Sequence, residues 1–186
     1  MKRLVSAILV SMVVIAAGPA AASTFLAMER PALVAEADAV VQGRVLKVDA
    51  FWEPTGTVIV SEAMVEVEDS LYGKTPTVVI VRTFGGTVNG FTIEAHGFPV
   101  FTQGERVLLF LEQDGEDRMR VTGYQQGHYR VVADARGGER AVPTTDAHAS
   151  LLTDDGKQAP AAEEMPLAEL KDLIRADAAR LGKSAD

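Results

Sequence analysis

The stretch "EADAVVQGRV", from Glu36 to Val45, decides which fold class the sequence predicts. A short polar run ending in Ala-Asp leads into valines typical of a β-strand, and Gly43 lies within that strand. Glycine inside a strand is typical of a bend, and strands that close into a small barrel must bend over one another. The segment therefore begins either a parallel α/β sheet or a small closed barrel, and the rest of the chain favours one of these.

The segments that follow are β-type, and no helical pattern separates them. Thr57–Glu68 is the clearest, because its apolar and acidic residues alternate. This period of two indicates a strand with one face on a core and the other in water. Without helical crossovers a parallel sheet is disfavoured, so we expect an antiparallel sheet. The buried face is predicted to carry Ile59, Ala63, Val65 and Val67, and the solvated face Glu62, Glu66 and Glu68.

Further strands are predicted at Thr77–Thr83, Phe91–Gly97 and Glu105–Glu112, followed by "RMRVTG" and "GHYRVV". The almost wholly apolar segment "ERVLLFLE" is expected to be a central strand. Short strands joined by Gly-rich turns predict a mainly β fold. We expect a small antiparallel five-stranded barrel of the OB type, the oligonucleotide/oligosaccharide-binding architecture. A β-sandwich is the second choice.

The first 22 residues have the pattern of a secretory signal peptide. Two basic residues precede the apolar run Leu4–Ala17, and small residues lead up to Ala22. The apolar run is shorter than the ~20 residues that span a membrane, although an uncleaved anchor is an alternative. We expect cleavage after Ala22, which makes Ser23 the mature N-terminus. The protein is then predicted to be periplasmic or secreted, with no stable membrane anchor after cleavage.

Composition narrows the classes of partner and chemistry. The formal net charge is −8, which argues against nucleic acid and anionic lipid as partners, since both are bound through Lys and Arg. The chain has no cysteine. Disulfides, thiolate metal sites and a cysteine nucleophile are therefore excluded.

The predicted barrel domain covers residues 23–133 and begins with a short helix or loop at Thr24–Ala37. Residues 134–164 are rich in Ala, Asp, Gly, Thr and Pro, which predicts a linker or loose extension. An amphipathic C-terminal helix is predicted over residues 165–182, and we expect it to pack on the barrel rather than on a partner. Its apolar face comprises Leu167, Leu170, Ile174, Ala178 and Leu181.

The sequence predicts no catalytic, cofactor or metal site. Gly-x-Ser-x-Gly, phosphate-loop and His-Glu-x-x-His patterns do not occur in it. Glu94 and His96 stand two apart in a predicted strand and share a face, but two ligands are too few for zinc. His128 is predicted to point outward, and His148 lies in the loose extension. The single tryptophan, Trp52, is either a stacking platform for a ligand or an anchor in the core or a loop.

Several phrases together resemble the netrin-like barrel module. They are "EADAVVQGRV", the long alternating strand, "LYGKTPTVVIV" and "GERVLLFLE", and the resemblance covers Ser23 to Val132. The best-known members of that family are the tissue inhibitors of metalloproteinases, and uncharacterised bacterial exported proteins show the same order of elements. The resemblance implies an OB-like (netrin-like) barrel and a role as a protease inhibitor. Ser23 holds the place of the family's N-terminal cysteine by position only, because this chain lacks the family's disulfides.

The sequence therefore predicts an exported, non-catalytic binding module. Its partner is expected to be an exported protein such as a metalloprotease, contacted through Ser23, Thr24 and Trp52. The alternative is a small extracytoplasmic hydrolase whose carboxylates come together only in three dimensions. A pocket lined by a carboxylate with a raised pKa would favour the hydrolase.

Overall fold

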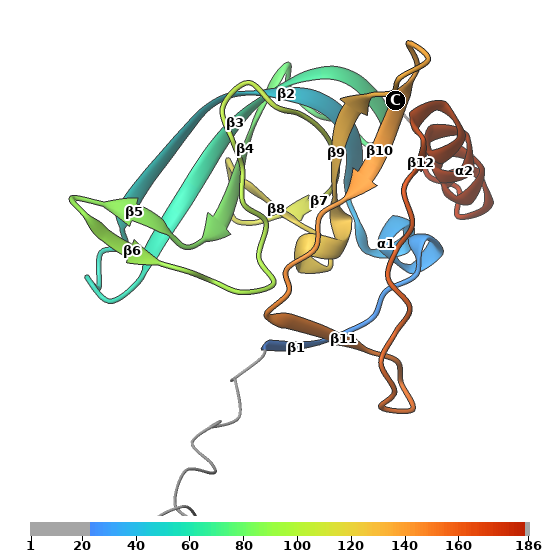
Figure 1. The fold of residues 1–186 in the computed structure, drawn as a ribbon. Helices are drawn as coiled ribbons and strands as arrows, with labels where there is room; N and C mark the ends of the chain where they lie inside the picture. Colours follow the sequence, from blue (N-terminus) through green and yellow to red (C-terminus); the bar gives the residue numbers. More distant parts are fainter. Residues whose placement is uncertain (1–22, 185–186) are drawn as a thin grey trace, which may run out of the picture.

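The fold is built around a closed β-barrel (Figure 1). A computed structural model describes residues 23–184, so the predicted signal peptide lies outside the described residues. The main sheet has eight strands in the order β12-β10-β9-β7-β2-β3-β4-β8, and β8 pairs with β7 as well, which closes a five-stranded barrel. The barrel strands are β2 (Ala39–Trp52), β3 (Ile59–Tyr72), β4 (Val78–Phe84), β7 (Arg106–Gln113) and β8 (Met119–Val121).

The predicted mainly β fold with a small OB-like barrel and a helix near each end is confirmed, and the barrel rather than the sandwich is observed. One barrel contact departs from the antiparallel expectation, because β4 and β8 run parallel where Val81 is opposite Met119. Gly43 allows β2 and β3 to approach closely. A Cβ at this position would lie 2.3 Å from the carbonyl oxygen of Glu66, and a register shift occurs between Gln42 and Gly43.

Strand β7 separates two hydrophobic cores, as expected of a central strand. Val107 and Leu109 point into the barrel, where they join apolar side chains from β2, β3, β4 and β8. Leu108 and Phe110 point out of the barrel and pack against the helices. Because both faces are buried, the strand is apolar at nearly every position and shows no alternation in the sequence.

The outer core is covered by an extension of the sheet and by two helices. Strands β9 (His128–Ala133), β10 (Glu139–Pro143) and β12 (Met165–Pro166) continue from β7. Helices α1 (Arg30–Glu36) and α2 (Leu167–Arg180) lie beside them in Figure 1. The expectation that residues 134–164 form a loose extension is wrong for β10, since it pairs along its length with β9. Ala141 is fully buried there, and one small side chain leaves little trace in the composition.

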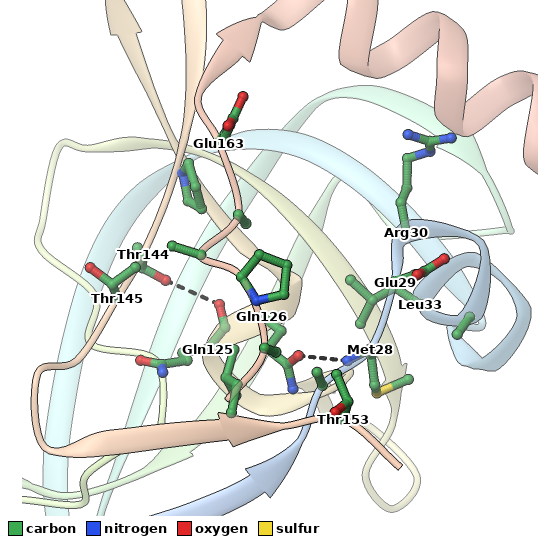
Figure 2. A pocket seen from close by; sticks show the side chains of 18 of the residues that line it. Met28, Glu29, Arg30, Leu33, Gln125, Gln126, Thr144, Thr145, Thr153 and Glu163 are labelled. Atoms are coloured by element: carbon green, nitrogen blue, oxygen red, sulfur yellow. Dashed lines mark hydrogen bonds between the residues drawn. The ribbon is translucent and has the colours of Figure 1, made fainter. Parts of the chain in front are cut away.

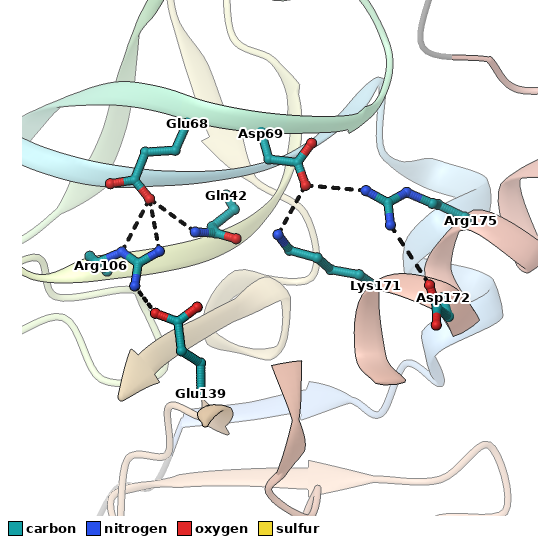
Figure 3. A network of polar contacts seen from close by, with 8 residues as sticks. All are labelled: Gln42, Glu68, Asp69, Arg106, Glu139, Lys171, Asp172 and Arg175. Carbon is teal, nitrogen blue, oxygen red and sulfur yellow. Dashed lines mark hydrogen bonds and ion pairs between the residues drawn. The ribbon is translucent and has the colours of Figure 1, made fainter. Parts of the chain in front are cut away.

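Helix α2 packs on its own chain, through both an apolar and a charged contact. Leu170 and Ile174 are buried in the outer core. On the polar side, Lys171 Nζ and Arg175 Nη2 lie 2.9 and 3.1 Å from the carboxylate of Asp69 on β3 (Figure 3). A neighbouring network links three barrel strands and β10 through Gln42, Glu68, Arg106 and Glu139.

Smaller elements complete the chain and position the site described below. Residues predicted as a helix or loop at Thr24–Ala37 form β1 (Ser23–Leu26) and then α1, and β1 pairs in parallel with β11 (Ala149–Leu152). The predicted strand at Phe91–Gly97 is shorter than expected. It forms only β6 (Phe91–Ile93), which makes a hairpin with β5 (Gly86–Val88). Within residues 23–184, no helix is both long and apolar enough to span a membrane.

Candidate functional site

A cleft of about 970 Å³ is lined by ionisable side chains that come from two distant parts of the chain. One wall is the β5–β6 hairpin with the loop that follows it to residue 105, and the other is the segment 143–148. Five ionisable side chains besides Arg130 line it: Glu94, His96, Glu105, Asp146 and His148. The cleft therefore combines residues from the predicted barrel domain with residues from the predicted extension.

Asp146 organises the polar end of this cleft. Its Oδ2 lies 3.0 Å from Nδ1 of His96 and accepts the backbone N–H of Gly97, while its Oδ1 accepts the backbone N–H of His148. Partial burial opposes ionisation of Asp146, but these hydrogen bonds hold its pKa below the usual value. The carboxylate thus fixes two histidines that are far apart in the sequence.

The rings of those two histidines lie against each other. Their centroids are 4.7 Å apart and the planes are tilted by 44°. Oε2 of Glu94 is 4.0 Å from Nε2 of His96, which agrees with the expectation that the two side chains share a face. In the part of the chain that the structure describes, no group of three or more His, Asp or Glu side chains is placed so that it could hold a metal ion.

Glu105 lines the same cleft in a different electrostatic environment. Burial raises the pKa of its carboxyl group, and the backbone N–H of Thr102 and the charge of Arg130 only partly offset this. The cleft therefore contains the feature that the sequence analysis associates with a hydrolase, a pocket carboxylate with a raised pKa.

A row of aromatic side chains, Phe84, Phe98, Tyr124 and Phe25, extends from the apolar side of the cleft. The successive ring centroids are 5.1, 5.0 and 4.6 Å apart. Phe84 and Tyr124 remain 46% and 45% exposed, which leaves a half-open apolar surface. Gly97 makes the row possible, because a Cβ at that position would lie 2.1 Å from the ring of Phe25.

Ser23, Thr24 and Trp52, the residues predicted to contact a partner, do not lie together in the structure. The backbone N–H of Ser23 donates to the carbonyl oxygen of His148 at 3.1 Å, so Ser23 and the exposed Thr24 lie on β1 beside the histidine pair. Trp52 ends β2, is 37% exposed and lies edge-on to Phe91 of the hairpin, with ring centroids 6.4 Å apart. Ser23 and Thr24 were predicted from the position of the mature N-terminus and not from the histidines, and sequence reasoning missed both Asp146 and the aromatic row.

A second cavity, of about 1130 Å³, lies between α1 and the strap formed by residues 153–163 (Figure 2). Several of its polar groups are hydrogen-bonded within the chain. Gln126 Oε1 accepts the backbone N–H of Met28 at 2.8 Å, and the hydroxyl of Thr144 donates to the carbonyl of Gln125 at 3.1 Å. Arg30, on the rim, pairs with Asp177 of α2 at 2.6 Å. Among the residues that the structure describes, the lining of this cavity includes no histidine, and Tyr129 is its single aromatic side chain, so it lacks the two features that distinguish the cleft.

His128 is buried on the face of β9 that packs against Phe101 of the barrel core, so the prediction that it points outward is wrong. Its side chain is fully buried, and its ring lies 4.9 Å from that of Phe101. The prediction assumed that β9 has one buried and one solvated face. Both faces are in fact buried here, because Tyr129 packs in the outer core while His128, on the opposite face, packs against Phe101 of the barrel core. Neither ring nitrogen has a hydrogen-bond partner, and burial together with the charge of Arg130 lowers the pKa of His128 to about 4.

Comparison of the chain with protein-family models, with curated proteins and with solved structures gave no match. The netrin-like resemblance therefore stays a prediction, and the function has to be argued from the cleft itself.

Proposed function

We infer that the mature protein is an exported, non-catalytic binding module that holds a segment of another exported protein in the cleft. The observation that carries this proposal is the aromatic row. Phe84 and Tyr124 are half-exposed, yet each is packed against Phe98 and is therefore held in place before any partner arrives. Preordered aromatic side chains beside a hollow are typical anchors for a protein partner.

A metalloprotease remains one candidate partner, as the netrin-like resemblance implies. One way to inhibit such an enzyme would be for the free amine and the carbonyl oxygen of a mature N-terminus at Ser23 to chelate the catalytic zinc of the protease. This route is less favoured than contact through the aromatic row. The nitrogen of Ser23 already donates to His148, and β1 continues as a strand beside β11. A protease zinc would have to break this pairing, which would reduce the net free energy of binding.

The proposal includes export and removal of residues 1–22. Intact-mass measurement of the protein recovered from the periplasm or the medium tests this, and the expected mass is that of a chain beginning at Ser23. A mass that retains the apolar run would rule out a soluble exported module.

Binding through the row is tested by placing a photo-crosslinking amino acid at position 84 or, as a control, at position 64. Met64 is 37% exposed on β3 and lies outside the cleft lining. We expect one discrete crosslinked protein from position 84 in exported material and none from position 64. With that partner purified, the double variant Phe84→Ala/Tyr124→Ala should weaken binding by about tenfold or more, and Met64→Ala should not. Equal crosslinking from both positions would contradict the proposal.

A hydrolase is the second candidate, and Glu105 is the observation that favours it. Burial raises the pKa of the Glu105 carboxyl group, which favours the protonated form that can donate a proton to a leaving group, and Glu94 and Asp146 line the same cleft. The test is a panel of glycoside and ester substrates with the mature protein and with Glu105→Gln. Turnover that Glu105→Gln abolishes would establish the enzyme, and its absence across the panel favours the binding module.

A further inference from the structure

We propose that His96 and His148 together bind a divalent transition-metal ion, Zn²⁺, with Glu94 as a third ligand. This site is at the polar end of the cleft and does not depend on the proposed protein partner. The proposal rests on a second carboxylate, Asp146, that positions the histidines rather than ligating the ion.

Asp146 leaves the correct nitrogen of His96 free. Its Oδ2 is 3.0 Å from Nδ1, so this nitrogen carries the proton of the neutral ring and Nε2 presents its lone pair. A carboxylate that holds one imidazole nitrogen while the other binds metal is a recurrent arrangement in zinc proteins. The same carboxylate accepts the backbone N–H of His148 at 2.8 Å, and so places the second histidine as well.

The two rings are close enough for one ion to reach both. Their centroids are 4.7 Å apart, and His148 is on the exposed surface, where its ring can rotate. Zn–N bonds of about 2.0–2.1 Å require the two nitrogens to approach within roughly 3.5 Å, so binding would include a rotation of the exposed His148 ring toward Nε2 of His96.

Glu94 supplies the third ligand by the same kind of movement. Its Oε2 is 4.0 Å from Nε2 of His96, and its side chain is 77% exposed, so a rotation toward an ion costs little packing. Two imidazoles, one carboxylate and a water molecule make the tetrahedral set that Zn²⁺ accepts. The three donors are not preassembled within the described residues, so binding involves this rearrangement.

The alternative is that the histidine pair only ties the loop after β6 to the segment before β11. A purely structural pair would hold its place without metal and would not change when Zn²⁺ is added. The two explanations therefore differ in whether the ring nitrogens respond to the ion.

The chain has three histidines, and the third provides an internal control. ¹⁵N-labelled mature protein without an affinity tag is titrated with Zn²⁺, and the ring nitrogens are followed by long-range ¹H–¹⁵N NMR. We expect the signals of His96 and His148 to shift together and to saturate at one equivalent. The buried His128 should not respond. A response of only one histidine, of all three, or of none at millimolar Zn²⁺ would overturn the proposal.

Calorimetric titration of variants assigns the roles. His96→Ala and His148→Ala should each weaken Zn²⁺ binding by more than about tenfold, and Asp146→Asn by about 10- to 100-fold through loss of positioning. Glu94→Gln should weaken binding, whereas the matched control Glu116→Gln, in the exposed β7–β8 turn, should not. An unchanged His128 signal shows that each variant is folded. Binding that survives both histidine variants would place the ion elsewhere and refute the site.

Discussion

The ammonium group of Lys183 lies 2.8 Å from the carbonyl oxygen of Val34 and connects the segment after α2 to the C-terminal end of α1. It also donates to the carbonyl oxygens of Ala35 and Ala37, at 2.8 and 2.5 Å, and lies 5.3 Å from the centre of the Tyr72 ring. These carbonyls lie at the C-terminus of α1, where helical hydrogen bonds run out and the helix dipole is negative. Lys183 follows α2 in the chain. Its side chain therefore caps α1 and holds the end of α2 next to it.

Replacing this lysine should therefore destabilise the fold. Lys183→Met keeps the apolar stem but leaves three carbonyls without their charged donor, and we expect a loss of about 1–3 kcal/mol in the free energy of unfolding. Urea denaturation of a chain that begins at Ser23 measures this. Lys157→Met is the matched control, because that side chain is exposed and pairs only with Asp155 in a turn. Equal stability of the two variants would show that the cap contributes nothing.

Neighbouring positions on β3 should respond oppositely to a change of charge. Val65 is fully buried in the barrel, so Val65→Asp places an unpaired carboxylate in an apolar interior and should cost several kcal/mol. Glu66 is exposed on the other face, so Glu66→Lys should change stability by about 0.5 kcal/mol or less. Thermal unfolding of both variants compares them directly. Similar losses in the two would mean that the barrel interior is assigned to the wrong face.

Strand β10 should be as well protected from exchange as the barrel, in contrast to the chain that follows it. Its residues 139–143 pair with β9 from Glu139 opposite Ala133 to Pro143 opposite Tyr129. Residues 160–164, at the end of the strap, are exposed. Hydrogen–deuterium exchange of peptides from the two segments should therefore show slow exchange in β10 and fast exchange in the strap. Equal rates would restore the description of residues 134–164 as one loose extension.

The sequence predicted those strands whose burial leaves a pattern in the side chains. The alternation in β3 identified Val65 and Glu66 correctly, and the apolar run of β7 correctly indicated burial on both faces. It did not predict β10, because the strand buries little more than Ala141 and owes its position to backbone pairing with β9. Every residue has a backbone carbonyl that can accept a hydrogen bond, and every residue except proline has a backbone N–H that can donate one, so such pairing leaves no side-chain signature.

The candidate site was predictable only in part, for a similar reason. Glu94 and His96 are neighbours in sequence, so their proximity follows from local geometry. Asp146 reaches His96 across 50 residues, and the row from Phe84 to Phe25 draws on four separate segments. Such contacts depend on how the loops fold back on the barrel. A single sequence does not encode that in any periodic pattern.

His128 should lower the stability of the fold at mildly acid pH, above the range in which the carboxylates with lowered pKa lose their stabilisation. Its pKa is about 4 in the folded state against 6.5 ordinarily, because burial and Arg130 disfavour the charged ring. As pH falls below 6.5 the unfolded chain takes up this proton while the folded chain does not, so stability is lost progressively until pH reaches about 4. We expect a loss of about 2 kcal/mol between pH 7 and pH 5 and about 3 kcal/mol by pH 4.

The measurement is urea denaturation at pH 7 and pH 5 for the native protein and for His128→Leu, which keeps an apolar side chain against Phe101. His128→Leu should remove most of the loss between these two values. The carboxylates with lowered pKa, among them Glu68 and Asp177, give up their stabilisation only at more acid pH and so do not contribute to the difference. His96 and His148 are present in both proteins and their effects cancel. If the native protein and His128→Leu lose the same stability at pH 5, His128 is not held neutral by burial.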